Sequence, residues 1–260
     1  MLPVLPSGKI ERYYAEKLDS QGYLLFSLVD PDKSYLEHGV AIAKESYENG
    51  ADVILLGGSI GAQGSQLDET ARMIREEVSI PLVLFPGNIS GLTPYADAVY
   101  FMQMLNSRDV YWLSTAKIQA APVVAKMKIE AIPTTYVVLE PGRAVGWIGN
   151  ANLVPRDRPD LAAACALAAK YSGSHVIITD SGSGAETAPP LSLVAGVSKA
   201  CAKELFYFYA GGVKTPAQAG QVIAAGADGI QVGTAFEDGK IGEKIRKFSE
   251  IMKKEGKKRV

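Results

Sequence analysis

The stretch Leu205-Phe-Tyr-Phe-Tyr-Ala-Gly-Gly-Val-Lys-Thr-Pro-Ala-Gln218 contains an apolar run, a glycine-rich turn and the start of a helix, in that order. The run Leu205–Tyr209 is unbroken, as is typical of a parallel strand buried on both faces. Thr215, followed directly by proline and three residues later by Gln218, has the pattern of a capped helix start. The stretch therefore predicts one strand–turn–helix unit of a parallel α/β fold.

Comparable units recur along the whole chain. Seven more strands are expected at Tyr23–Val29, Asp52–Leu56, Leu82–Phe85, Ala98–Met102, Thr134–Leu139, His175–Ile178 and Gly229–Val232. Helix caps are expected at Ser34 and Ser65, and a helix over Ile10–Leu18 is expected to plug the bottom of the fold. Eight units without a flexible linker favour a closed barrel over an open doubly wound sheet. We predict that residues 1–260 form a single (β/α)₈, or TIM, barrel domain.

One unit departs from this pattern. Between Phe85 and Ala98 the chain contains two prolines and two glycines, which makes it poor material for the helix that usually joins two parallel strands. We therefore expect a modified barrel that lacks its third helix. The missing helix would leave a groove on the side of the barrel.

The composition excludes several classes of protein. A formal net charge of −1 gives no broad attraction to nucleic acid. No apolar run approaches the roughly 18 residues of a transmembrane segment, and the N-terminus lacks the pattern of a signal peptide. Cys165 and Cys201 lie in apolar helical stretches and are expected to be reduced, so we expect a cytoplasmic protein. The basic tail Lys253–Arg259 permits transient membrane contact, but a solvated, frayed end is the preferred interpretation.

Three loops that follow predicted strands are rich in glycine. They are Asp180-Ser-Gly-Ser-Gly184, Ala210-Gly-Gly-Val-Lys214 and Gly233-Thr-Ala-Phe236. Glycine alone can mean only a tight turn, but it also lets backbone N–H groups approach an anion, and a helix N-terminus adds favourable partial charge. Because loops after the strands build barrel active sites, three such loops together predict a phosphate site at the C-terminal mouth.

A second cluster follows the first two strands. Asp30 ends the first strand, and Gly57-Gly-Ser59 ends the second. A carboxylate beside a hydroxyl suits Mg²⁺, which fills its remaining positions with water and phosphate oxygens. The spacing alone does not distinguish this metal-ligand role from a structural one, in which Asp30 only caps a turn. Spacing also leaves open whether the apolar loop 140–149 is a lid or a packed loop.

Several motifs together resemble the geranylgeranylglyceryl phosphate synthase family, which includes heptaprenylglyceryl phosphate synthases. The sequences of the motifs are most similar to the archaeal-type branch. The matching stretches are Leu28-Val-Asp-Pro-Asp-Lys33, Gly57-Gly-Ser59, Leu84-Phe-Pro-Gly-Asn88, Met104-Leu-Asn-Ser-Arg108, Thr135-Tyr-Val-Val-Leu-Glu-Pro-Gly142, Gly182-Ser-Gly-Ala185, Gly212-Val-Lys-Thr-Pro216 and Asp228-Gly-Ile-Gln-Val-Gly-Thr234. They occur in order from the first strand to the last.

The resemblance implies transfer of a prenyl chain from a prenyl diphosphate to the C3 hydroxyl of sn-glycerol 1-phosphate in ether-lipid biosynthesis, with Mg²⁺. It implies that Asp30 and Ser59 hold the metal and that Asp180 is the catalytic carboxylate. The predicted glycerol phosphate site comprises Ile178, Thr179, Asp180, Ser181, Gly182, Ser183, Gly184, Gly211, Gly212, Gly233 and Thr234. It also implies a homo-oligomer, either a dimer or a hexamer.

The chain departs from the family at the catalytic carboxylate. The family's usual Tyr-Leu-Glu stretch reads Ile178-Thr-Asp180 here, so a hydroxyl is lost and the carboxylate is one methylene shorter. Tyr136 or Thr179 could compensate. This departure motivates an alternative function, a catalytically impaired barrel that binds a phosphate or prenyl ligand. An isomerase or aldolase is disfavoured because no well-placed catalytic lysine is evident.

Overall fold

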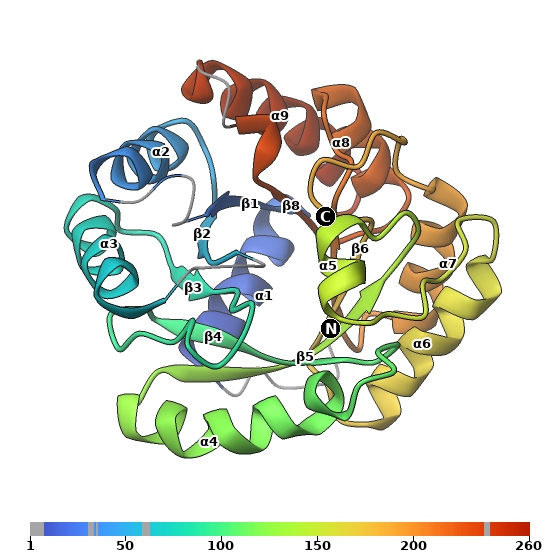
Figure 1. Cartoon of the computed structure of the whole chain (residues 1–260). Helices are drawn as coiled ribbons and strands as arrows, with labels where there is room; N and C mark the ends of the chain where they lie inside the picture. The colour runs from blue at the N-terminus through green and yellow to red at the C-terminus, as the bar shows by residue number, and fades with distance from the viewer. Residues whose placement is uncertain (1–7, 31–33, 35, 59–62, 237–239) are drawn as a thin grey trace.

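The computed structural model describes residues 8–30, 34, 36–58, 63–236 and 240–260. In this part of the chain eight parallel strands close into a barrel in sequence order, with β8 hydrogen-bonded to β1 (Figure 1). The expected modified TIM barrel is confirmed. The strands are β1 Leu24–Val29, β2 Val53–Leu56, β3 Leu82–Leu84, β4 Ala98–Met104, β5 Glu130–Val138, β6 Val176–Asp180, β7 Phe206–Ala210 and β8 Gly229–Val232.

Most of the helices surround the ring of strands (Figure 1). The α-helices are α1 Lys9–Gln21, α2 Glu37–Glu48, α3 Gly64–Glu77, α4 Ala116–Met127, α5 Arg143–Ile148, α6 Pro159–Tyr171, α7 Leu191–Cys201, α8 Pro216–Ala224 and α9 Ile241–Gly256. A short helical turn, η1 Tyr111–Thr115, leads into α4, and another, η2 Thr234–Phe236, follows β8.

The helix caps follow the sequence only in part. Thr215 caps α8 as predicted, since its side chain accepts a hydrogen bond from the Gln218 backbone N–H. The caps expected at Ser34 and Ser65 are wrong. Leu36 and Gln63 precede α2 and α3, and neither makes a side-chain capping bond.

The third crossover has no helix, as the sequence predicted. Residues 85–97, all of which the structure describes, join β3 to β4 through turns and irregular backbone. The next helix in the chain, α4, comes only after β4 and packs against it. β4 is contacted by η1 and α4, which follow it in the chain, and no helix from the preceding crossover packs beside them. This opening shapes the site described below.

Helix α1 closes the bottom of the barrel, which confirms the predicted plug (Figure 1). The ring of Tyr14 makes edge contacts with Phe26 and Phe208 from the strands, at centroid distances of 5.7 and 5.6 Å. The carboxylate of Glu130, at the start of β5, accepts hydrogen bonds from the backbone N–H groups of Ile10 and Glu11. This negative charge sits where the helix dipole favours it.

The C-terminal tail has solvent-exposed lysines, as expected, but it is helical and bound to the barrel, so the expectation of a frayed end is wrong. Helix α9 continues to Gly256 and buries Ile245, Phe248 and Met252 along one stripe. Beyond it, the Arg259 guanidinium contacts the Asp228 carboxylate at 2.7 Å. No helix among the described residues is long and apolar enough to cross a membrane.

Candidate active site

Two pockets meet at the mouth of the barrel, where the strands end. One, called the polar pocket below, combines charged and polar side chains with glycines and small apolar residues, and the other is lined mainly by apolar side chains. Leu28, Phe85, Asp180 and Ser183 line both of them. Asp180 is the carboxylate among these four, so an acidic group stands at the junction of a polar and an apolar compartment.

The polar pocket is built from the three glycine-rich loops that the sequence singled out. Its lining includes Asp180, Ser183, Gly184, Gly211, Gly212, Gly233 and Thr234 from the predicted set. The Ser183 and Thr234 hydroxyls are 2.8 Å apart and join the loops after β6 and β8. The predicted loops therefore do converge, and they do so beside the N-terminal end of α8.

Gly211 shows why this pocket needs glycine. Its φ is +80°, a left-handed conformation that side chains rarely adopt. A Cβ atom at this position would also lie 2.6 Å from Asp180 Oδ1. A larger residue would therefore displace the carboxylate from the junction of the two pockets.

Four residues of the predicted set are not in the lining of the polar pocket. Ile178 is buried inside the barrel, and the Gly182 N–H is used by Asp180. Thr179 Oγ1 and Ser181 Oγ each lie 2.9 Å from a tyrosine hydroxyl, that of Tyr207 and Tyr209 respectively. Those two rings belong to the layer between the barrel and its helices, so the Thr179 and Ser181 hydroxyls are engaged away from the pocket.

Asp180 is held by two hydrogen bonds. Tyr136 Oη donates to Oδ2 at 2.5 Å, and the Gly182 N–H donates to Oδ1 at 2.6 Å. Burial raises the pKa of Asp180 above its usual value, while both hydrogen bonds oppose that shift. Burial and the neighbouring carboxylate raise the pKa of Tyr136 well above its usual value, so Tyr136 remains a donor. Of the two residues considered as compensating for Ile178, Tyr136 is the one that contacts Asp180.

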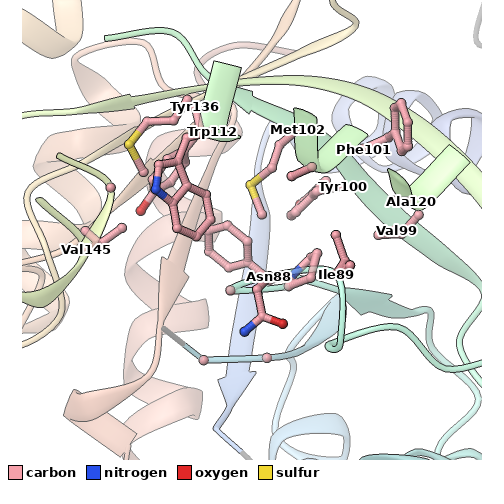
Figure 2. A pocket seen from close by; sticks show the side chains of 18 of the residues that line it. Asn88, Ile89, Val99, Tyr100, Phe101, Met102, Trp112, Ala120, Tyr136 and Val145 are labelled. Atoms are coloured by element: carbon pink, nitrogen blue, oxygen red, sulfur yellow. The ribbon is translucent and has the colours of Figure 1, made fainter. Parts of the chain in front are cut away.

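The apolar pocket runs from Asp180 to the outer side of the barrel. Near the junction it is lined by Tyr136, Trp112 and Val145, and at its other end by Val99, Phe101 and Ala120 (Figure 2). The link without a helix supplies Asn88, Ile89 and Leu92, and helix α4 supplies Ala116, Ala120 and Val124. The groove expected at the missing third helix is therefore present, and it is a lined apolar trough.

Besides Asp180 at the junction, Lys117 is a charged residue in the lining of this trough. Lys117 Nζ donates a hydrogen bond to Gln103 Oε1 at 2.7 Å, and burial lowers the pKa of the ammonium group. The aliphatic stem of a lysine can cover apolar surface while its head reaches a polar partner. Lys117 therefore fits an apolar trough.

The loop 140–149 contains helix α5, whose Val145 and Ile148 line the trough. Ser107 Oγ donates to the Gly149 carbonyl at 2.6 Å, and the Ala151 N–H donates to the Gly146 carbonyl. The loop is thus packed and bonded in this structure, and it forms a wall of the apolar pocket.

One of the two predicted metal ligands, Asp30, lies at the polar pocket. Asp30 is half-buried and lines it, and a Cβ atom at Gly58 would lie 2.5 Å from Asp30 Oδ1. The glycine thus lets the end of β2 approach the carboxylate closely. Ser59 lies outside the described residues. Within the described part of the chain, no three His, Cys, Asp or Glu side chains gather into a metal site.

Three polar residues in the lining of this pocket were not predicted as site residues. Lys214 is exposed at its edge, and Lys244 donates to the Ala235 carbonyl from α9. Lys244 carries no local signal, because it is one of several lysines on an amphipathic helix. Gln231 is a polar residue within an otherwise apolar strand, and that anomaly could have identified it.

Comparison with known proteins agrees with this geometry. The PcrB family model matches residues 17–252. The geranylgeranylglyceryl phosphate synthase of Methanosarcina acetivorans is 41% identical over 94% of this chain and 98% of its own length. The synthase of Pyrococcus horikoshii is 42% identical over 95% of this chain and 96% of its own length.

A solved structure is similar over the same extent. It is the (S)-3-O-geranylgeranylglyceryl phosphate synthase from Thermoplasma acidophilum in complex with its substrate sn-glycerol-1-phosphate. The TM-score is 0.88 at 31% identity, covering 93% of this chain and 98% of that one. The chain therefore belongs to the PcrB family, and the resemblance to geranylgeranylglyceryl phosphate synthases expected from its motifs is confirmed.

Proposed function

We propose that this protein is a prenyltransferase that joins a prenyl diphosphate, such as geranylgeranyl diphosphate, to the C3 hydroxyl of sn-glycerol 1-phosphate and releases diphosphate. The observation that carries the proposal is the junction at Asp180 between a phosphate-type glycine pocket and an apolar trough. A polar acceptor and a long hydrocarbon donor need two such compartments that open onto one reacting centre.

The polar pocket suits the glycerol phosphate. Backbone N–H groups of the glycine loops, the N-terminal end of α8 and two lysines, Lys214 and Lys244, match the charge of a phosphate. With the phosphate held there, the glycerol carbons extend toward Asp180. The trough along α4 then takes the prenyl chain, because its burial against apolar side chains is favourable.

The reaction breaks the allylic C–O bond, and its electron pair leaves with diphosphate. The C3 oxygen of the acceptor forms the new bond to prenyl C1. The Asp180 carboxylate accepts the hydroxyl proton, and Tyr136 and the Gly182 N–H keep that carboxylate in place. The apolar walls of Phe85 and Trp112 exclude water, which would otherwise compete as the acceptor.

The residues at Asp30 fit a magnesium ion. A single half-buried carboxylate beside a glycine turn is the kind of partial donor set that Mg²⁺ completes with water and substrate oxygens. We propose that Asp30, with Ser59, holds it next to the diphosphate. Bound there, the ion would neutralise charge on the leaving group.

The decisive experiment is a product assay. Purified protein is incubated with sn-glycerol 1-phosphate, geranylgeranyl diphosphate and Mg²⁺, and ether product is identified by mass spectrometry. We expect geranylgeranylglyceryl phosphate and released diphosphate, and less product from sn-glycerol 3-phosphate. Tight binding of both substrates without any product would instead support a ligand-binding barrel and overturn the proposal.

We also propose that the chain works in the cytoplasm as a homo-oligomer, dimer or hexamer. Sedimentation velocity at micromolar concentration tests the assembly. A monomer would contradict it.

A further inference from the structure

Gln231 is an interior polar residue that the reaction described above does not use. Its register partners are Phe26 on β1 and Ala210 on β7, both of which belong to the cluster inside the barrel. Its side chain lines the polar pocket and is only 5% exposed. Gln231 is therefore a buried amide at the wall of the acceptor site.

The two ends of this amide are in different situations. Nε2 lies 3.3 Å from Tyr100 Oη, on the opposite side of the barrel interior, and donates to it. Oε1 is buried and accepts no hydrogen bond from any described residue. A buried carbonyl oxygen without a donor costs free energy, so such groups in folded proteins are nearly always satisfied. The unsatisfied atom can only accept, and the described residues supply no donor for it, so a donor from a molecule bound in the pocket would satisfy it.

The register places Gln231 at the same level as Asp180. Asp180 pairs with Ala210 across β6 and β7, and Ala210 pairs with Gln231 across β7 and β8. Ala210, whose side chain is a single methyl group, is the residue between them in this register. Two strand spacings separate the backbones, about 10 Å. A carboxylate and an amide, both in the lining of the polar pocket, therefore stand two strands apart at one level of it.

From this juxtaposition we infer that Gln231 positions the acceptor by accepting a hydrogen bond from its C2 hydroxyl through Oε1. The inference rests on the proposed function and identifies which acceptor fits. While Asp180 faces the C3 hydroxyl, Gln231 selects a hydroxyl at C2 over a ketone, because a carbonyl there would place two acceptors face to face. Gln231 is thus a specificity-determining residue for a phosphorylated polyol.

The test compares two acceptors and two proteins. Wild type and Gln231→Met are assayed for kcat/KM and Kd with sn-glycerol 1-phosphate and with 3-hydroxypropyl phosphate, which lacks the C2 hydroxyl. We expect wild type to prefer glycerol phosphate by about 10- to 100-fold, the range for loss of one buried hydrogen bond. In Gln231→Met the ratio of kcat/KM for the two acceptors should approach 1, because kcat/KM falls for sn-glycerol 1-phosphate and not for 3-hydroxypropyl phosphate.

Equal losses on both acceptors would mean a structural role and overturn the inference, as would a preference that survives the substitution. Gln231→Leu is run beside Gln231→Met, so that a folding defect in one variant does not decide the result. Gln221→Met, at an exposed position of α8, is the matched control and should behave as wild type. If wild type forms no ether, the proposed function fails, while the ratio of the two Kd values still decides the role of Gln231. Equal Kd values in wild type overturn that role.

Discussion

Tyr136 and Asp180 form a buried pair in which the phenol donates to the carboxylate at 2.5 Å. The pair joins neighbouring strands, because Tyr136 lies on β5 and Asp180 at the end of β6. Burial favours the neutral form of the acid, and the phenol hydrogen bond favours the ionised form. The protonation state of Asp180, the proposed catalytic base, therefore depends on this contact.

Replacing Tyr136 with phenylalanine should shift the pH profile. Removing the donor destabilises the ionised carboxylate, so the pKa of Asp180 should rise further. A base must be deprotonated to act, so activity is present above this pKa and lost below it. The acid limb of kcat/KM against pH should therefore move to higher pH in Tyr136→Phe. An acid limb that stays in place or moves to lower pH would contradict the role given to Tyr136.

Asp180→Asn tests the carboxylate itself. An asparagine can keep both contacts, with its oxygen accepting from Gly182 and its amide donating to Tyr136, so the fold should be preserved. Loss of the base should lower kcat by about 10²- to 10⁴-fold. The Kd for glycerol phosphate, measured by calorimetry, should change much less. The reverse pattern, weak binding with kcat retained, would mean that Asp180 serves only to bind the acceptor.

Asp30→Ala should abolish Mg²⁺-dependent turnover. The substitution removes the carboxylate offered to the metal at the edge of the polar pocket. Initial rates are measured over a Mg²⁺ titration. The matched control is Asp19→Ala, since Asp19 is exposed on α1 at the opposite end of the barrel. Full activity in Asp30→Ala at the wild-type Mg²⁺ requirement would remove Asp30 from the site.

Filling the far end of the trough should discriminate among donors. Ala120 lies there with Val99 and Phe101 (Figure 2), so Ala120→Trp should shorten the space for the chain. We expect kcat/KM to fall about 10-fold or more for geranylgeranyl diphosphate, from the cost of overpacking, with a smaller change for geranyl diphosphate. Gln119→Trp, exposed on the same helix, is the control. An equal fall in kcat/KM for both donors would mean that the prenyl chain lies outside this part of the trough.

Much of the fold could be predicted because parallel strands leave strong local signals. The unbroken apolar runs and the capped start at Thr215 identified the units, and the proline- and glycine-rich link identified the missing helix. Strand ends were less accurate. β5 begins at Glu130, four residues before the predicted start, because Pro133 interrupts the pattern although its carbonyl still accepts from the His175 N–H.

The site was predictable where glycine loops determine the backbone and not where tertiary contacts decide. Thr179 stands next to Asp180 in sequence, but alternation along β6 directs it toward Tyr207 outside the barrel. Gln231 and Lys244 reach the pocket from β8 and α9, and their role depends on how strands far apart in sequence align. The spacing of residues along the chain does not predict that alignment.

The central claim is that glycerol phosphate and the prenyl chain meet at Asp180. A crystal structure with sn-glycerol 1-phosphate, Mg²⁺ and an unreactive thiolo analogue of geranylgeranyl diphosphate tests it most directly. We expect the phosphate among the loops of Ser183, Gly212 and Thr234, with the C3 hydroxyl within hydrogen-bond distance of Asp180 and the prenyl chain along α4. A C3 hydroxyl remote from Asp180, or a chain outside the trough, would contradict it.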